Sequence, residues 1–569
     1  MSCGKSHQRE RLVRPFLTNE PDMCFSKQCR CSPEQVPNAM QTTLSSSHPG
    51  LGKNMSTLPL ADPDDYTWRQ AGDKSTLWQR RVCGAEVPIA ELCNGIYVSS
   101  SAFTSALVDG KYSLQDVKRA ARAAWRLLRY EEPHIAGNAV REAHGRVLLQ
   151  YRIPKDEEEV ESWLDRTILV EPSSEAPMAI RNACRKDWMR NSPGALEAAT
   201  IYFVAAVQDM LTPLNGTRLR ILFDVYSLFY DGIGFRCMIA SFLRGLAAQL
   251  STSDAVSHNK LDWNKSTDNL REACIKLLAP EQYVFGPISN ENIKEMWTGR
   301  SPEFCIYPML VAETPAIWGL SETIFITFTK EQSETMATAV PQILGPGYSI
   351  IHLGQAAFLL AQIKLKPDDI PDSSHWCCFT AINGRPYMQE PYKSYRKPYL
   401  PHCQIIGLVG FDEVTNYVQR GHHTKAKTLE LLIKAAKQSK DGYEKTCNLP
   451  HIMGMSVPIA EEICEGWSYG IAQPMYACWG MDERYIPWHF KNDKEEKVIT
   501  LADLCFWGDN YTPFPLVRLT CWRRAWRLAV DFNRSCFDEA LMRTFVDEMA
   551  SLMILFAFPD SIEERASEA

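Results

Sequence analysis

The sequence predicts an α/β protein large enough for one extensive core or two. Its 569 residues exceed a typical domain length three- to fourfold, and 45% are apolar and 23% charged, which is a globular composition. Patterns typical of strands and of helices alternate from Trp68 to Phe558. They lack the regular strand–helix spacing of a barrel, and no repeat of short period is present.

The first 60 residues differ from the rest. They are poor in apolar periodicity and rich in Ser, Pro and Gln, with a linker-like stretch at Ser45–Gly50. Such a segment buries too little surface to offset the entropy lost on ordering, so we expect residues 1–60 to be a disordered extension.

A first amphipathic helix is expected after Ser113. This serine and Asp116 form a helix-start signal, and apolar residues follow at helical spacing as far as Leu128. Pro133 cannot continue a helix, so the helix ends before it.

A strand followed by a helix is predicted further along. Apolar side chains occupy every second position from Leu219 to Val225, which is typical of a half-buried strand. Asp231 and Gly232 then turn the chain into an apolar helix that runs to about Leu250. The junction between strand and helix is a frequent place for chemistry.

The second half repeats the mixture of elements. Pro308–Pro315 shows no clear element and is expected to join two lobes. We expect strands at 323–329, 404–411, 471–477 and 516–531, and helices at 331–343, 352–365 and 537–558.

Composition excludes several classes of protein. The net charge of −7 and the pI of about 6.0 argue against a nucleic-acid or anionic-membrane surface as the main partner. No apolar run is long enough to span a bilayer, and no apolar segment of secretory type follows the polar N-terminus. The 19 cysteines include no CxxC pair, so we expect reduced thiols in a cytoplasmic protein, with no metal site.

Three short motifs carry little weight. Ser468 lies in a GxSxG pattern, but a charged segment precedes it instead of a buried strand. His258–Asp262 matches HxxxD in a polar stretch, and the adjacent His422 and His423 point to different sides of any regular element. We expect none of them to be a catalytic or metal site.

The segment Phe223–Gly232 resembles the HHxxxDG motif of the superfamily of acyl-CoA-dependent acyltransferases and peptide-synthetase condensation domains. Other blocks, in the same order, are similar to the trichothecene O-acetyltransferase branch of fungal secondary metabolism. These blocks lie at 123–133, 351–357, 382–385, 399–404 and 531–538.

The resemblance implies a two-lobed fold like that of chloramphenicol acetyltransferase, with a tunnel between an N-terminal lobe (61–315) and a C-terminal lobe (316–569). It also implies O-acyl transfer to a small-molecule metabolite. Acyl-CoA is then the expected co-substrate, with no cofactor bound, and a monomer without nucleic-acid or membrane partners is expected.

The two histidines of the motif fall here on Tyr226 and Ser227. In the superfamily the second histidine removes the proton of the attacking hydroxyl, which a serine cannot do because it is a far weaker base. Ser227, Asp231 and Gly232 are therefore the expected catalytic-motif positions, with the usual base missing.

The aspartate of the motif has a structural role in the superfamily, where it pairs with an arginine. Arg385 is the expected partner of Asp231, and Arg129 is the alternative. Tyr226, Asn383 and Arg385 are the expected substrate-binding residues, and Gly232 is expected to let the backbone pass close to the tunnel.

Three functions remain open at this level. The first is acyl transfer with a substitute base or by orientation alone, for which His352, His375 and His402 are the candidate bases. The second is a non-acyl enzyme on the same fold, such as a cyclase or pericyclase that shapes a reactive intermediate. The third is an inactive homologue, or a hydrolase that uses Ser468.

Overall fold

The computed structural model describes most of the chain after residue 61. The described residues are 57–58, 62–93, 99–143, 145–176, 179, 197–252, 261–283, 288–289, 321–365, 375–394, 397–418, 424–449, 451–457, 460, 475–510 and 515–558. The expected extension and the expected joint at Pro308–Pro315 lie outside these ranges, apart from the short strand β1 (Thr57–Leu58), which pairs with β10 (Ile288–Ser289).

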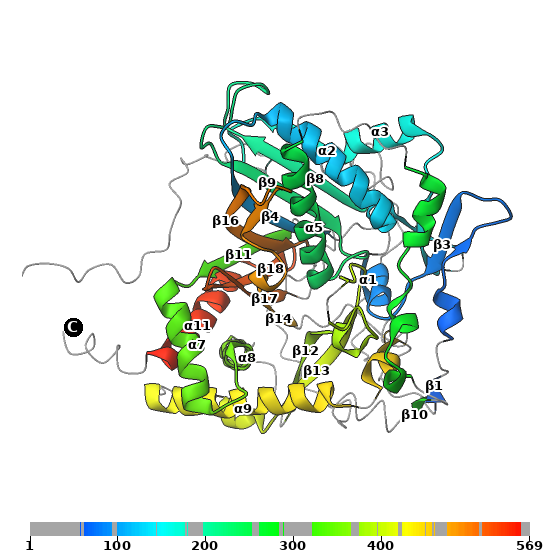
Figure 1. The fold of residues 1–569 in the computed structure, drawn as a ribbon. Coiled ribbons are helices and arrows are strands. Elements are labelled where there is room, and N and C mark those ends of the chain that lie inside the picture. The colour runs from blue at the N-terminus through cyan, green and yellow to red at the C-terminus, as the bar shows by residue number, and fades with distance from the viewer. Residues whose placement is uncertain are drawn as a thin grey trace, which may run out of the picture. The chain divides into compact units, whose positions relative to one another are not determined.

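A first six-stranded sheet contains the strand predicted before Asp231. Its strands, in spatial order, are β15 (His489–Lys491), β16 (Lys497–Gly508), β4 (Ser99–Val108), β9 (Leu219–Tyr226), β8 (Ala199–Ala205) and β7 (Ile168–Pro172). The helices beside it are α2 (Leu114–Glu131), α3 (Glu157–Thr167) and α5 (Gly232–Leu250), as Figure 1 shows.

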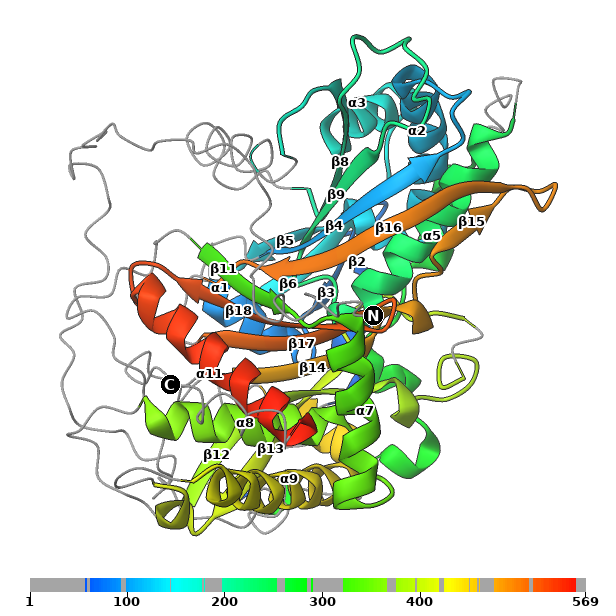
Figure 2. The same cartoon turned by 90° about the vertical axis from the view of Figure 1, so that its left-hand side faces the viewer.

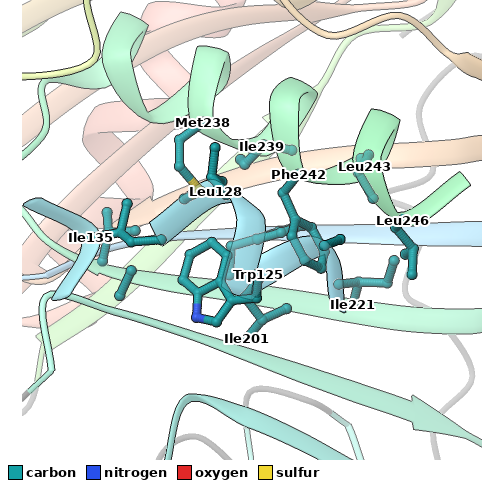
Figure 3. Close-up of a cluster of buried hydrophobic side chains, with 14 of the residues drawn as sticks. Trp125, Leu128, Ile135, Ile201, Ile221, Met238, Ile239, Phe242, Leu243 and Leu246 are labelled. Carbon is teal, nitrogen blue, oxygen red and sulfur yellow. The ribbon is translucent and has the colours of Figure 1, made fainter. Parts of the chain in front are cut away.

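Apolar packing joins this sheet to its helices. Figure 3 shows Trp125 of α2 and Phe242 of α5 in the core, with Ile221 of β9 beside them. The rings of Trp125 and Phe242 meet edge to face at 5.5 Å, a favoured geometry for aromatic pairs. By length and composition alone α5 could cross a membrane, but it is a core helix, with most of its apolar window buried.

A second six-stranded sheet is formed by the later part of the chain. Its order is β11 (Ser321–Thr327), β18 (Ala525–Asn533), β17 (Leu516–Trp522), β14 (Met475–Met481), β12 (His375–Asn383) and β13 (Gln404–Asp412). The helices α7 (Lys330–Leu344), α8 (Ile350–Lys364), α9 (Lys425–Cys447) and α11 (Glu539–Ala557) gather beside it in Figure 2.

Smaller elements complete the description. A four-stranded sheet has the order β2 (Arg69–Gln70), β3 (Leu77–Arg81), β6 (Val147–Arg152) and β5 (Asn138–Arg141). The helix α1 spans Glu86–Cys93, and short 3₁₀ turns lie at 63–66, 133–136, 263–269, 274–277, 280–282, 385–387, 414–417 and 482–484.

Several predicted elements are confirmed. The Ser113 hydroxyl accepts a hydrogen bond from the N–H of Asp116, and the Asp116 carboxylate accepts one from the N–H of Ser113. The helix-start signal of α2 is therefore a capping box. The strand and the helix on either side of Asp231 lie where the periodicity placed them. The predicted strand at 516–531 was wrong in one respect: it is a hairpin, because the chain reverses at Arg523 and Arg524.

The division of the chain at residue 316 does not hold for residues 489–508. The strands β15 and β16 come from the C-terminal half but pair within the first sheet, where β16 lies antiparallel to β4. Figure 2 shows β16 alongside β4, between the helices of the first sheet and the strands of the second. Strand pairing over such a distance in sequence leaves no mark on local periodicity, which is why the sequence did not predict it.

Candidate active site

Asp231 lies where β9 ends and α5 begins. Its carboxylate Oδ1 caps the helix, accepting hydrogen bonds from the N–H groups of Ile233 at 3.1 Å and Gly234 at 2.7 Å. The first turn of a helix leaves such N–H groups without partners inside the helix, and a carboxylate is the strongest acceptor for them. The DG sequence therefore builds this junction locally.

Arg385 pairs with Asp231, as predicted. Its Nη1 and Nη2 donate to Oδ2 and Oδ1 of Asp231 at 2.8 and 3.0 Å, and the N–H of Cys403 donates to Oδ2 at 2.9 Å. Burial alone would raise the pKa of Asp231, but Arg385, His402 and the hydrogen bonds hold it below its usual value. The alternative partner, Arg129, lies instead over the ring of Trp163, with 4.6 Å between its guanidinium carbon and the ring centroid.

The expected substrate-binding role of Arg385 does not fit this geometry. Its side chain is fully buried, and its Nε and Nη2 also donate to the carbonyl oxygens of Tyr399 and Pro401. The amide oxygen of Asn383 accepts from the N–H of Arg385 at 3.2 Å, so Asn383 helps to position it. A guanidinium with all its donors engaged has none left for a substrate, and Arg385 is therefore a positioning residue.

Two glycines allow the close packing at this junction. A Cβ atom on Gly234 would lie 1.9 Å from the carbonyl oxygen of Leu400, so no side chain fits there. A Cβ on Gly232 would lie 3.3 Å from the indole of Trp479, which is tight but less severe. The sequence prediction named Gly232 and missed Gly234, although the pattern Asp-Gly-Ile-Gly could have indicated both.

Ser227 is half-buried beyond the end of β9, and its hydroxyl lies 3.0 Å from that of Ser100. Among the described residues, Ser100 is the single hydrogen-bond partner of the Ser227 side chain. The neighbours of Ser100 are also engaged: Ser99 donates to Asp509 and Ser101 to Asp224, at 2.8 and 2.7 Å. The run of three serines at the start of β4 was not predicted as part of the site.

The ring of Tyr226 packs edge-on against that of Phe229, with 5.8 Å between the centroids. Its backbone is paired with Ser99 of β4, and its side chain is half-buried. A role in substrate binding stays a prediction for Tyr226.

A second buried ion pair lies further along α5 and was missed entirely. Nε of Arg236 donates to Oδ1 of Asp482 at 2.6 Å, and Nη1 donates to the carbonyl oxygen of Gly232 at 2.6 Å. The guanidinium also lies over the rings of Trp479 and Phe506, at 4.7 and 4.3 Å from their centroids. Burial raises the pKa of Asp482 to about 6, although Arg236 opposes the shift.

None of the candidate bases has a hydrogen bond to Ser227 in the described part of the chain. His352 closes the N-terminal turn of α8, where its Nδ1 accepts from the N–H of Ser349. His402 is buried beside Asp231, and burial lowers its pKa. The side chain of His375 and the motifs at Ser468, His258 and His422–His423 lie outside the described residues.

The chemistry that these groups can supply is positional. Two neutral hydroxyls can orient an acceptor alcohol and exchange hydrogen bonds with it, but neither is a base of useful strength at neutral pH. Within the described ranges no three His, Cys, Asp or Glu side chains are grouped as metal ligands.

Two lobes of α/β build, with an Asp-Gly junction beside their interface, define a condensation-domain-like fold. The condensation domain of the monacolin K polyketide synthase MokA has this fold, with a TM-score of 0.51 at 11% identity over 85% of this chain and 97% of that one. The solved structure of the TRI3 trichothecene 15-O-acetyltransferase of Fusarium sporotrichioides is more similar, with a TM-score of 0.78 at 22% identity over 88% and 99%.

The sequence matches the family described as 15-O-acetyltransferase Tri3 over residues 58–460, and the chain belongs to that family. It is 23% identical to the trichothecene 15-O-acetyltransferase TRI3 of Fusarium sporotrichioides, over 88% of this chain and 98% of that protein. It is 21% identical to the trichothecene O-acetyltransferase TRI3 of Trichoderma arundinaceum, over 89% and 100%. The protein thus belongs to a family of acetyltransferases, and the two relatives named here are trichothecene O-acetyltransferases of fungi.

Proposed function

We propose that this protein transfers an acyl group from acyl-CoA to a hydroxyl of a small secondary metabolite, and that it does so by orienting the two substrates without a histidine at residue 227. The observation that supports this most directly is the contrast within one motif. Asp231 keeps its arginine partner and its helix cap, whereas the reacting position carries the Ser227 hydroxyl, paired with Ser100.

In the proposed reaction the acceptor oxygen attacks the thioester carbonyl carbon. A C–O bond forms, the C–S bond breaks, and the proton of the acceptor hydroxyl ends on the coenzyme A thiol. Ser227 and Ser100 hydrogen-bond the acceptor and direct its oxygen at the carbonyl. Orientation of this kind lowers the activation barrier by at most about 7–11 kcal/mol. A general base would raise the rate by about 10²–10⁴-fold.

The relatives named as trichothecene acetyltransferases make a trichothecene alcohol the acceptor to try first. The purified protein is incubated with acetyl-CoA and this alcohol, and both the acetylated product and free coenzyme A are measured. A monomeric, cytoplasmic enzyme is part of the proposal, and size-exclusion chromatography and localisation of a tagged chain test those two points.

Two variants at one residue test the mechanism. Ser227→Ala should keep most of the transfer rate, because Ser227 does not act as a base and the Ser100 hydroxyl still orients the acceptor. Ser227→His places an imidazole at the motif position, and the rate should rise, toward about 10²-fold. Absence of transfer in the parent and in Ser227→His, over a range of acyl-CoAs and alcohols, refutes the proposal.

A second candidate function is a cyclase or pericyclase, which is favoured by the pairing of Ser227 with the neutral hydroxyl of Ser100 where the superfamily motif has histidine. Such an enzyme needs a shaped cavity and no proton transfer. The same Ser227→His variant separates the two candidates, because a larger ring crowds the cavity and should slow a cyclisation or leave it unchanged. Conversion of a pathway intermediate without acyl-CoA would support this second function.

A further inference from the structure

A cavity of about 350 Å³ lies where β16 of the first sheet passes the strands β11, β17 and β18 of the second. Asp503 and Leu504 of β16 form one wall, Thr520 of β17 and Arg527 of β18 form another, and Lys330 and Arg523 also line it. Figure 2 shows β16 and the β17–β18 strands next to each other in this part of the molecule. The volume is within the range of small-molecule sites.

The lining of this cavity carries an excess of positive charge. Among the described residues that line it, Asp503 carries the one carboxylate, which lies 3.4 Å from Nη2 of Arg527 and is balanced by that charge. Lys330 and Arg523 are exposed, and no carboxylate of the described residues lies within 4 Å of the charged end of either. Two cations are therefore available to an anionic ligand.

The position of Arg523 is defined, although its side chain is exposed. Its guanidinium carbon lies 4.7 Å from the centroid of the Trp488 ring, and its N–H donates to Glu483. Arg523 and Arg524 are the two residues of the β17–β18 turn, and both have left-handed backbone conformations, with φ of 49° and 65°. Asn and Gly are the usual residues there, so two arginines cost conformational energy that a functional role can offset.

The strand β16 runs from the wall of the cavity to the residue that pairs with Ser100. Gly508 of β16 lies opposite Ser100 of β4, and Leu504 is four residues back along the same strand. Four extended residues span about 13 Å. The pantetheine arm of coenzyme A is an extended chain of about a dozen atoms, which is the length of about four residues of backbone. An extended pantetheine arm is thus long enough to reach from an acyl group at Ser100 and Ser227 to the cavity.

We propose that this cavity binds the adenosine 3′,5′-bisphosphate end of the acyl donor, with Lys330 and Arg523 as its phosphate ligands. The proposal rests on the proposed acyl-CoA-dependent function and names the part of the protein that recognises the donor. Guanidinium and ammonium groups are the usual side chains that donate hydrogen bonds to phosphate in proteins, and such charge-assisted bonds are stronger than those between neutral groups.

Binding is tested without any turnover. Adenosine 3′,5′-bisphosphate is titrated into the full-length protein by calorimetry. Arg523→Gly should weaken binding about tenfold or more, and Lys330→Ala should do the same. Glycine fits the left-handed conformation at residue 523, so this variant should fold as well as the parent.

Arg524→Gly is the matched control. It also removes one arginine and relaxes one left-handed residue of the same turn, but Arg524 lies 3.4 Å from Glu334 and does not line the cavity. The Arg524→Gly variant should bind adenosine 3′,5′-bisphosphate with the same affinity as the parent. Equal losses in Arg523→Gly and Arg524→Gly, or parental affinity in the double variant Lys330→Ala/Arg523→Gly, overturn the proposal. Inorganic phosphate competing as well as the bisphosphate would mean a simple anion site and would also overturn it.

A kinetic arm separates this proposal from the proposed function. With acetyl-CoA, Arg523→Gly should raise KM about tenfold and leave kcat unchanged; with acetyl-pantetheine, which lacks the nucleotide, KM should not change. A KM that rises equally for both donors refutes the phosphate site. Bisphosphate binding that depends on Lys330 and Arg523, without transfer from either donor, refutes the proposed function and supports the phosphate site.

Discussion

Two buried carboxylate–arginine pairs join the first turns of α5 to the later part of the chain, and their carboxylates are in different surroundings. Asp231 accepts five hydrogen bonds, two from Arg385 and three from backbone N–H groups. Asp482 accepts from Arg236 through Oδ1, while its Oδ2 has no partner among the described residues.

The pKa values of the two carboxyls move in opposite directions for this reason. Burial raises both, but at Asp231 the arginine and the hydrogen bonds more than compensate, and its pKa falls below the usual value. At Asp482 burial prevails, and the pKa rises to about 6. An ion pair in the interior is thus favourable in its charged form only where the remaining lone pairs are also satisfied.

The largest loss of folding stability is expected from Asp231→Asn. The substitution leaves the buried Arg385 without a counter-charge, and removing one partner of a buried pair costs about 3–5 kcal/mol. Denaturant unfolding of parent and variant measures the loss. Full stability combined with lost activity would instead indicate a direct chemical role for Asp231.

A slightly smaller effect is expected at the glycine beside the first pair. Gly234→Ala should destabilise the protein by about 3 kcal/mol, because the methyl group would overlap the carbonyl oxygen of Leu400. Gly232→Ala is the control: its methyl group would lie 3.3 Å from the Trp479 ring and from Nη1 of Arg236, so it should cost about 1 kcal/mol or less. Equal losses in the two variants would contradict the packing described for Gly234.

The contributions of Asp482 and Asp231 to folding stability should change with pH in opposite directions. Asp482 has a raised pKa, so its protonation stabilises the folded state below about pH 4, and this contribution is lost as the pH rises through about 6. Relative to Asp482→Asn, the parent should lose up to about 3 kcal/mol of stability across that window.

Asp231 should show the reverse. Its pKa is lowered, so its contribution is present above the usual pKa of an aspartate, about 3.9, and is lost as the pH falls below it. Unfolding free energies of the parent, Asp231→Asn and Asp482→Asn, measured from pH 3 to 8, give both profiles. Parallel profiles for the two variants would show that the surroundings of the carboxylates do not differ as described.

The smallest effect is expected at the serine pair. Ser100→Ala removes one half-buried hydrogen bond to Ser227 and should cost about 0.5–1.5 kcal/mol. Differential scanning calorimetry of Ser100→Ala beside Ser227→Ala measures it. Because both variants lose the same bond, their losses should agree, and the double variant should add little to either.

The sequence by itself determined the local parts of this protein. The capping box at Ser113 and Asp116, the strand from Leu219 and the Asp231 cap of α5 all follow from residues within a few positions of one another. The pairing of Asp231 with Arg385, 154 residues away, was predicted from the resemblance of two motifs and not from periodicity.

Only the tertiary structure decided which distant segments lie together. The pairing of β16 with β4, the contact of Gly234 with Leu400 and the pair of Arg236 with Asp482 join residues 166 or more positions apart, and no local pattern names the partner. Periodicity reports which face of an element is buried, because burial follows from the spacing of apolar side chains along one segment. Which distant segment covers that face depends on how all the segments pack together, and that packing also set the opposite pKa shifts of Asp231 and Asp482.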